Sequence, residues 1–494
     1  MSGGKPIFYS AVVLTLVNLL LRLVGTGFQV YLSGRIGAEG IGLLQLVMSV
    51  GSMAMVAGMA GVRTATMYLT AEEMGCGRPG NTRWILSGCV QYSMACSMTV
   101  AAALILFAPQ VAEKWIGNPT TVDAVRLFGA FLPVNCLTGV MVGYFTGAQR
   151  IRTLAAVEIA EQACSMICTV LLLKEWAGQD AAKCCLSVVM GSGIGSCMTL
   201  SALVWLRMAE RRERTSRIPM ARRLLDTTVP LAIADDLRTG ISTVENLMVP
   251  RRLALYPGTL SPLAVFGTVC GMVFPILMFP VAILYGLTEL LIPELARCRA
   301  AGSQTRIEYL VKRSLRIAML YGILCAGILF LTAPELCRKL YDSQEAGTYL
   351  RWFAPLAVML YCDTVTDAMI KGLGQQKASV RYNIVTNLMD VALLYGLLPK
   401  YGIGGYFFSF LVTHAINFWL SGRRLLQISR VRIEWRMPAA ALAVATAAVW
   451  AAGLLAAPAM RAGAYCVMLF CGLFLTGAVS REDLLWLKGL ICKK

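Results

Sequence analysis

Apolar residues recur along the chain in runs of about 20, which is the helix length that crosses the roughly 30 Å hydrocarbon layer of a bilayer. The runs are rich in Leu, Ala, Val, Met and Gly and do not alternate with period two, as membrane strands would. They therefore predict helices, which satisfy their own backbone hydrogen bonds in lipid. The predicted spans are 7–33, 41–69, 84–107, 123–147, 152–173, 185–206, 227–250, 262–292, 315–333, 350–370, 379–398, 402–421, 437–457 and 463–479.

The pattern thus predicts an all-α polytopic membrane protein of about fourteen transmembrane helices. The seventh span, 227–250, is the weakest by hydropathy, because it contains Asp235, Asp236, Arg238 and Glu245. Charge supports it: with both termini cytoplasmic, most of the 45 Lys and Arg residues fall in inward-facing segments, and this alternation fails without the seventh span. We therefore expect a multi-pass protein with both termini in the cytoplasm.

Composition agrees with lipid as the solvent, since 57% of the residues are apolar and only 15% are charged. The net charge of +18 is then mainly a topology signal, directed at anionic headgroups of membrane lipids and not at nucleic acid. The 17 cysteines mostly fall inside apolar runs without metal-ligand spacing, so neither a metal site nor a disulfide framework is expected.

A basic segment divides the chain into two series of spans. A weak internal repeat supports this division, because Gly147, Gln149 and Arg150 recur as Gly374, Gln376 and Lys377 in the second series. Parallel repeats of this kind place a substrate between two lobes and allow alternating access. The predicted parts are an N-lobe (1–206), a cytoplasmic linker (207–225), a C-lobe (226–425), and two extra spans with an interfacial tail (426–494).

Polar residues form stripes on several predicted spans. A charge in hydrocarbon costs roughly 2.5–3.5 kcal/mol even on insertion scales, so such residues normally face a cavity or a partner. Residues three or four positions apart share one helical face. The stripes are Asn18, Arg22, Thr26 and Gln29 on span one; Glu158, Glu161 and Gln162 on span five; Asp235, Arg238, Ser242 and Glu245 on span seven; Asp363, Asp367 and Lys371 on span ten; and Asn383, Asn387 and Asp390 on span eleven.

Each stripe also has an ordinary explanation. Asp235 and Arg238 form an intrahelical pair as readily as a ligand site. Arg63, near the inner end of span two, reaches the interface as easily as a substrate. Glu158 and Glu161 fit a partly solvated helix end. Arg22 has no acidic neighbour at i±3 or i±4, which favours a cavity-lining role.

Two further features are assigned to structure. Arg251 and Arg252 are interpreted as the outer edge of span seven. His414, the one histidine, is interpreted as a packing residue and not a proton relay. The sequence contains no phosphate-binding loop and no Ser–His–Asp arrangement outside the spans, so we do not expect an enzyme. The remaining classes are transporter, channel and scaffold, and no selectivity-filter pattern favours a channel.

Several short motifs resemble one family over nearly the whole chain. They are Gly37 to Leu46, Gly61 to Thr64 leading to Ala71 to Glu73, Gly143 to Gly147 with Glu161 and Gln162, Val249 to Leu253, Gly271 to Pro275 with Phe279 and Pro280, and Lys371 to Gly374 with Tyr401 to Gly404. In order and spacing the chain resembles the polysaccharide-export and stage V sporulation protein B branch of the multidrug/oligosaccharidyl-lipid/polysaccharide (MOP) exporter superfamily.

The resemblance implies two six-helix lobes in a V, followed by two C-terminal helices. It also implies a monomer in the bacterial plasma membrane that flips undecaprenyl-pyrophosphate-linked oligosaccharide or peptidoglycan precursor by alternating access, for cell-wall synthesis or sporulation. Arg22 and Arg63 match arginines on spans one and two of relatives that flip peptidoglycan precursor. Those relatives are similar in carrying a third arginine, on span eight. Span eight of this chain has no Arg or Lys between Ser261 and Glu294, and Arg238 on span seven is the candidate replacement.

We therefore expect Arg22, Arg63 and Arg238 to bind the pyrophosphate, because the guanidinium suits phosphate oxygens. The residues expected to line the cavity or to handle a coupling Na⁺ or H⁺ are Asn18, Glu161, Asp235, Glu245, Asp363, Asp367, Lys371, Asn387 and Asp390. No other cofactor is expected. The alternatives are a cation-coupled multidrug or metabolite antiporter of the same superfamily, and a scaffold for cell-wall enzymes that transports nothing.

Overall fold

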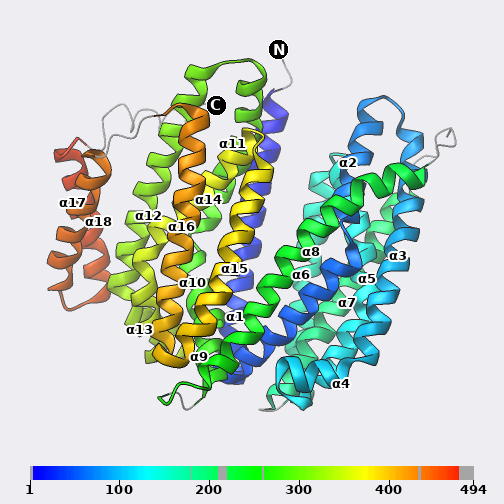
Figure 1. Cartoon of the computed structure of the whole chain (residues 1–494), viewed down its shortest axis with the longest axis horizontal. Coiled ribbons are helices and arrows are strands. Elements are labelled where there is room, and N and C mark those ends of the chain that lie inside the picture. Colours follow the sequence, from blue (N-terminus) through cyan, green and yellow to red (C-terminus); the bar gives the residue numbers. More distant parts are fainter. Residues whose placement is uncertain (1–3, 178–179, 210–219, 259–260, 432–435, 478–494) are drawn as a thin grey trace. The chain divides into compact units, whose positions relative to one another are not determined.

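The computed structural model describes residues 4–177, 180–209, 220–258, 261–431 and 436–477. Within these ranges, the side chains of residues 4–18, 177, 220–223, 226–227, 230–231 and 234 are outside the described part. Every regular element in the described residues is helical (Figure 1).

The first series of helices is α1 (Gly4–Met59), α2 (Val62–Gly75), α3 (Thr82–Leu106), α4 (Ala108–Gln110), the π-helix η2 (Val111–Ile116), α5 (Val122–Gly147), α6 (Ile151–Leu172), the π-helix η4 (Leu173–Ala177) and α7 (Ala181–Met208). The second series is α8 (Met220–Leu253), α9 (Pro262–Thr268), the π-helix η5 (Val269–Val273), α10 (Phe274–Met278), α11 (Val281–Ala300), α12 (Gln304–Tyr341), α13 (Gln344–Phe353), α14 (Ala357–Gly372), α15 (Gln376–Tyr401), α16 (Ile403–Ser429), α17 (Arg436–Gly453) and α18 (Pro458–Leu475). Short 3-10 turns at 79–81, 119–121 and 354–356 connect neighbouring helices.

The predicted class, an all-helical multi-pass membrane protein, is confirmed. Among the described residues, ten helices are long and apolar enough to cross a membrane, or eleven if the bent pair Pro262–Met278 and Val281–Ala300 is one span. Each predicted span nevertheless overlaps one or more of the described helices, although the span 41–69 is interrupted between Met59 and Val62. The number fourteen stays a prediction, because it requires the two arms of α1 to cross separately and the charged helices α8 and α15 to cross as well.

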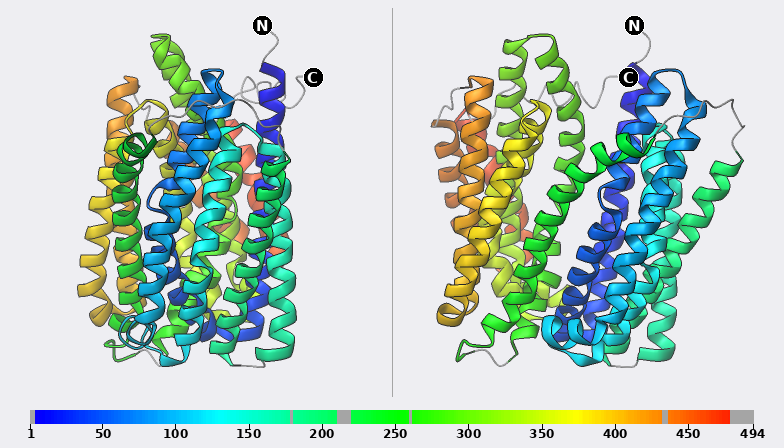
Figure 2. Two further views of the ribbon diagram at one scale, coloured as in Figure 1. Left: turned by 90° about the vertical axis from the view of Figure 1, so that its right-hand side faces the viewer. Right: turned by 45° about the vertical axis from the view of Figure 1, so that its right-hand side comes forward.

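The chain forms two compact units, and the first contains residues 1–271 and 387–406. In this unit α5 packs against α3 and α7, and α6 packs against α7. Part of its core consists of Val62 and Leu69 from α2, Ile85 and Cys89 from α3, and Val140 from α5. Apolar side chains and close helix packing therefore hold this unit together (Figure 2).

Helix α1 changes direction at Gly37, whose φ of 68° and ψ of −179° are open to glycine and unfavourable for other residues. The kink separates an arm that ends at residue 36 from an arm that begins at residue 38. The second arm meets α9 at very short range, because a Cβ on Gly267 would overlap the carbonyl oxygen of Ala38 and one on Gly42 would overlap that of Leu263. Small residues permit this backbone contact, as they do in other membrane helix pairs.

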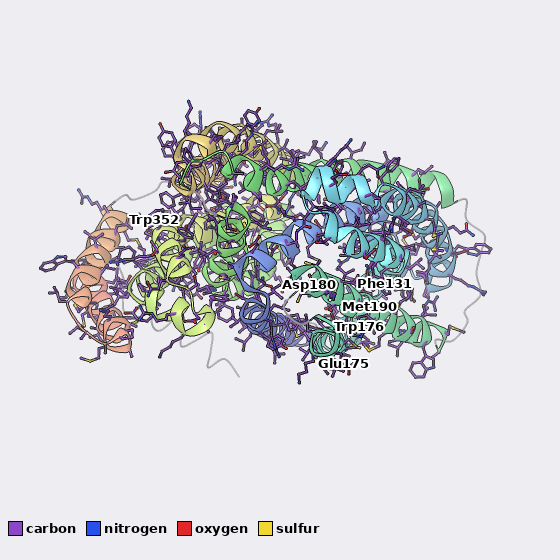
Figure 3. The ribbon with its side chains drawn as sticks, turned by 90° about the horizontal axis from the view of Figure 1, so that it is seen from below. Phe131, Glu175, Trp176, Asp180, Met190 and Trp352 are labelled. Carbon is purple, nitrogen blue, oxygen red and sulfur yellow. The ribbon has the colours of Figure 1, made fainter. Side chains whose placement is uncertain are left out.

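Figure 3, a view from below, labels Phe131 of α5, Met190 of α7 and Trp176 of η4 in the first unit. Gly193 of α7 leaves the space that the Phe131 ring fills. Asp180 caps α7 by accepting a hydrogen bond from the Ala182 N–H at 3.0 Å. Trp176 is 56% exposed, which is typical of an aromatic side chain at the membrane–water interface.

The second unit contains residues 272–386 and 407–494. Its core joins α12 to α13, α14 and α11, and Figure 2 shows α11 and α12 as a hairpin. Between α10 and α11 the chain bends by 58° near Pro280, which cannot donate a backbone hydrogen bond. The Pro280 carbonyl accepts from the Tyr321 hydroxyl at 2.9 Å, and the Leu277 carbonyl accepts from the Tyr361 hydroxyl at 2.7 Å.

Helices α17 and α18 pack as a pair against α12 (Figure 1). The Tyr465 hydroxyl donates to the Ile323 carbonyl at 2.8 Å, and its ring lies against Gly327. Arg461 forms an ion pair with Glu335 at 3.0 Å. Polar contacts thus supplement the apolar packing of the two predicted extra spans.

We predict that Gly267→Leu destabilises the protein, because the added side chain must push α9 away from the Ala38 carbonyl. Overpacking of this kind costs about 1–3 kcal/mol or more. The matched control is Gly240→Ala in α8, where a Cβ meets nothing within 4 Å and helix propensity improves. In thermal unfolding in detergent, Gly267→Leu should melt several degrees below wild type and Gly240→Ala should not; equal melting would show that the α1–α9 contact is not required.

Candidate functional site

Helix α6 links the first arm of α1 to α2 within the first unit. The Gln162 side chain donates to the Leu21 carbonyl at 3.0 Å, next to Arg22. One turn earlier, Glu158 is half-buried and close enough to Arg63 of α2 for their charges to interact. One face of α6, which carries Glu158 and Gln162, therefore contacts α1 and lies close to α2. All three helices carry predicted site residues.

Arg22 itself is half-buried, whereas Arg63 is exposed. Further along the stripe, Thr26 donates to the Arg22 carbonyl at 2.9 Å and Gln29 donates to the Gly271 carbonyl at 3.2 Å. The predicted polar face of span one is thus engaged with protein from residue 21 to residue 29. The side chain of Asn18, the first residue of that stripe, lies outside the described residues.

Glu161 lies on the same helix face as Glu158, and it accepts from the Ser196 hydroxyl of α7 at 3.4 Å. Small residues surround it, since Gly195 of α7 packs against the backbone of Glu161. The carboxylates of α6 are therefore held by neighbouring helices. Because Glu158 interacts with Arg63, this group of side chains contains both negative and positive charges. An anionic ligand can compete with the carboxylate for the arginine.

Helices α8 and α15 bring two carboxyl groups together. Glu245 of α8 is half-buried, Asp390 of α15 is 7% exposed, and their side chains are within hydrogen-bonding reach. Two carboxylates at this distance repel each other unless they hold a proton or a cation between them. The structure thus brings together two predicted site residues, Glu245 and Asp390, that are far apart in sequence.

Two residues that the sequence did not single out surround this pair. Tyr406 is 6% exposed and lies near both carboxyl groups, and its hydroxyl is 4.0 Å from the sulfur of Cys270. Neither residue belongs to a polar stripe, because Tyr406 follows the turn at Gly402 and Cys270 lies in an apolar run. Their proximity to Glu245 and Asp390 requires the three-dimensional packing of α8, η5, α15 and the first turn of α16.

Helix α8 is also fastened to the second arm of α1 beside this pair. Thr243 donates its hydroxyl to the Ser49 carbonyl at 3.2 Å, and Asn246 donates its amide to the Ser49 hydroxyl at 3.0 Å. These bonds fix the rotation of α8 at the turn that contains Glu245. Asn387 is half-buried one turn before Asp390.

Asp235 and Arg238 occupy exposed positions further back on α8. No ion pair joins the two side chains, both of which are described, so the intrahelical pair left open by the spacing does not occur here. Arg238 takes no part in the contacts that α6 makes with α1 and α2. Its role in pyrophosphate binding stays a prediction.

The second unit holds the remaining predicted carboxylates. Asp367 pairs with Lys371 at 2.6 Å and accepts a hydrogen bond from Ser379. Asp363 accepts from the Asn417 amide at 3.0 Å, and His414 stacks on Phe410 with ring centroids 3.9 Å apart. The Lys371 ammonium already pairs with Asp367, so Asp367 is not open to a coupling cation. Among the described residues, no ion pair is formed by Asp363.

In the described part of the chain, no group of three or more His, Cys, Asp and Glu residues is arranged to hold a metal ion. A site for a tightly held transition metal is therefore not formed by these side chains. The arrangement instead offers cationic side chains for an anion and a carboxyl pair for a proton or an alkali ion.

Two family models and a relative of known type match the chain. The family described as polysaccharide biosynthesis protein matches residues 8–250, and the MatE family matches residues 256–395. Stage V sporulation protein B of Bacillus subtilis (strain 168) is 23% identical over 409 residues, which cover 79% of this chain and 78% of that protein.

Two solved structures have a similar fold. The lipid II flippase MurJ in an inward closed conformation aligns with a TM-score of 0.70 at 10% identity, covering 96% of this chain and 100% of that one. A multidrug resistance MATE family transporter in an inward-facing conformation aligns with a TM-score of 0.66 at 13% identity, covering 85% of this chain and 100% of that one.

The fold and the family matches define a transporter of the MOP exporter superfamily. Within that superfamily, residues 8–250 match the polysaccharide biosynthesis family, and the chain is similar to stage V sporulation protein B. The family resemblance predicted from the motifs is therefore confirmed, and so is the expectation that the protein is not an enzyme.

We predict that Asp367 and Glu245 respond differently to neutral substitution. Asp367→Asn removes an ion pair and weakens a hydrogen bond, so it should lower stability by about 1–3 kcal/mol and leave transport per folded molecule near wild type. Glu245→Gln should keep the fold but abolish the response of transport to the coupling ion. Thermal unfolding together with transport assays at matched protein levels would check both; the opposite pattern would assign coupling to the second unit.

Proposed function

We propose that this protein flips undecaprenyl-pyrophosphate-linked oligosaccharide or peptidoglycan precursor across the bacterial plasma membrane by alternating access. The match to the polysaccharide biosynthesis family supports a lipid-linked saccharide as the substrate. The MurJ-like fold is consistent with the same substrate class. The proposal needs a cationic position on membrane helices that accepts a pyrophosphate.

The observation that carries the proposal is Arg63 beside Glu158 of α6, together with the half-buried Arg22 on α1, the helix that Gln162 of α6 contacts. Arg22 adjoins the Leu21 carbonyl that α6 contacts, and Arg63 interacts electrostatically with Glu158. Arginine donates several N–H groups in one plane and so suits pyrophosphate oxygens. Arg63 is exposed, so an incoming pyrophosphate can replace Glu158 as its partner.

Coupling is assigned to the carboxyl pair of Glu245 and Asp390. Binding of H⁺ or Na⁺ removes the repulsion between the two groups, and release restores it. Because Thr243 and Asn246 tie the same turn of α8 to Ser49, a change at the pair acts directly on the α8–α1 contact. The proposed cycle therefore links ion occupancy to the position of α8.

A cation-coupled multidrug or metabolite antiporter is the second candidate. The match of the MatE family to residues 256–395 favours it. A pocket for cationic drugs requires unpaired carboxylates, whereas Glu158 lies beside Arg63 and Asp367 is paired with Lys371. The charges at these two positions are thus more favourable to an anionic lipid than to a cationic drug.

We predict that the wild-type protein restores growth to bacterial cells depleted of their lipid II flippase, and that Arg22→Gln does not. Loss of one arginine from a pyrophosphate site weakens binding by about ten- to a hundredfold, because charged hydrogen bonds contribute about 1.5–3 kcal/mol. Growth on depletion and protein level in the membrane are measured together. Arg83→Gln, an exposed arginine at the start of α3, is the matched control.

The outcomes separate the candidates. Rescue by wild type and by Arg83→Gln alone supports the assignment of Arg22. Rescue by all three variants contradicts the assigned site. Absence of rescue despite full membrane insertion contradicts the peptidoglycan precursor as substrate, and extrusion of cationic dyes by the same cells would then establish the antiporter.

We also propose that both termini are cytoplasmic, which places the turn after α2 on the inner side. Cys76 is exposed in that turn. A membrane-impermeant maleimide should therefore label Cys76 in opened membranes but not in intact cells, with Cys76→Ser as the background for the other thiols. Labelling in intact cells that disappears in Cys76→Ser would reverse the orientation.

A further inference from the structure

An open cavity of about 740 Å³ lies in the first unit where α8, α15, the second arm of α1 and η2 meet. Figure 1 shows α8 and α15 side by side along this region. The cavity is lined by Met53, Trp115, Thr243, Val244, Leu247, Met248, Arg251, Arg252, Leu255, Val391 and Tyr395. Its lining residues on α8 run from Thr243, in the turn that contains Glu245, to Arg252 at the α9 end of the helix.

The wall of this cavity is apolar, apart from Thr243, the tyrosine hydroxyl and two arginines. Met53, Leu247 and Val391 come from three different helices and together present a hydrocarbon surface. Such a surface favours an apolar chain over a hydrated sugar or a free anion. The volume is within the range of about 300–1,000 Å³ that is usual for small-ligand sites.

The two arginines bound the cavity at the end of α8. Arg251 donates from Nη2 to the Trp115 carbonyl at 2.8 Å and also to the Lys114 carbonyl. The guanidinium of Arg252 lies 3.2 Å from the ring centroid of Tyr395. Neither arginine pairs with a carboxylate among the described residues, so both positive charges remain uncompensated.

Their geometry leaves donors for a ligand. The bonds of Arg251 use Nη2, and an arginine has further N–H groups on Nε and Nη1. When a guanidinium lies over an aromatic ring, its N–H groups point outward along the ring plane and not into the ring. They can therefore donate to the oxygen atoms of a ligand. The two neighbouring residues therefore present a double cationic position next to an apolar wall.

Topology does not explain these arginines. With the orientation proposed above, the α8–α9 end faces the outer side, where the positive-inside rule disfavours Lys and Arg. The dipole of α8 stabilises a cation at this end, but one residue would serve that purpose. The sequence-based interpretation of Arg251 and Arg252 as a span edge therefore leaves their number and the adjacent cavity unexplained.

We propose that this cavity is a second binding site for the isoprenoid diphosphate part of the transported lipid, distinct from the site at Arg22 and Arg63. Arg251 and Arg252 hold the diphosphate, and the first isoprene units lie against Met53, Leu247 and Val391. The proposal rests on the proposed function and specifies where the lipid is held on the outer side before release. A single narrow chain fits this volume better than the two acyl chains of a phospholipid.

The test uses farnesyl diphosphate as the probe and the full-length protein in phosphatidylcholine nanodiscs. We expect saturable binding that is about ten- to a hundredfold weaker in Arg251→Gln/Arg252→Gln, because two charged donors are lost. Arg299→Gln is the matched control, since Arg299 also donates to a backbone carbonyl, that of Leu373, but does not line the cavity. Its affinity should equal that of wild type.

A second variant keeps both arginines and fills the apolar wall. Leu247→Trp should weaken farnesyl diphosphate binding by a similar factor, and it also covers the case in which the double arginine variant does not fold. Inorganic diphosphate and phosphatidylglycerol, each at the concentration that saturates with farnesyl diphosphate, should not displace the probe. Displacement by either one overturns the assignment to an isoprenoid diphosphate.

The two proposals fail in different ways. Binding that is unchanged in both cavity variants but lost in Arg22→Gln removes the second site and leaves the proposed function intact. Absence of any farnesyl diphosphate binding to the wild-type protein contradicts both. If both sites exist, the cavity variants should bind farnesyl diphosphate more weakly but still bind it. Adding Arg22→Gln to a cavity variant should abolish this residual binding.

Discussion

A charged side chain in hydrocarbon costs roughly 2.5–3.5 kcal/mol or more, and this cost determines where the ionisable residues of the chain lie. In the first unit, Glu158 lies beside Arg63, and Glu245 lies beside Asp390. In the second unit, Asp367 is paired with Lys371. Several of the described charges within the helices therefore lie beside partners on neighbouring turns or helices, and the proposed position for a coupling ion is the carboxyl pair of Glu245 and Asp390.

The same constraint explains how the helices are joined. Lipid provides little hydrophobic drive for helix association, so close packing and hydrogen bonds between helices contribute more. Glycines at 42 and 267 permit close backbone contact between α1 and α9. Ser49 accepts two hydrogen bonds from α8, and tyrosines of α12 and α14 donate to carbonyls around the bend after α10. The two bonds to Ser49 fix the turn of α8 that contains Glu245, and changes in them would change the geometry of the carboxyl pair.

Much of the fold follows from sequence, because span length and the positive-inside rule act locally. Residues 227–250 are helical as predicted, although four charged residues lower their hydropathy. The kink at Gly37 and the bend at Pro280 were not predicted, since backbone dihedral angles are not encoded in hydropathy. The stripes identified Glu245 and Asp390 separately, but their contact, and those of Tyr406 and Cys270, depend on helix packing. Arg251 and Arg252 were interpreted as a span edge, and only the cavity beside them suggests another role.

The most direct test of lipid-linked substrate flipping uses the purified protein in liposomes that contain a fluorescent undecaprenyl-diphosphate sugar in both leaflets. A membrane-impermeant quencher is added, and the fraction of protected fluorophore is followed with time. The account predicts that wild-type protein exposes the protected fraction, that Arg22→Gln slows this exposure at least tenfold, and that a fluorescent phosphatidylcholine remains protected. Continued protection of the undecaprenyl lipid in vesicles that contain folded wild-type protein, under both Na⁺ and H⁺ gradients, would contradict it.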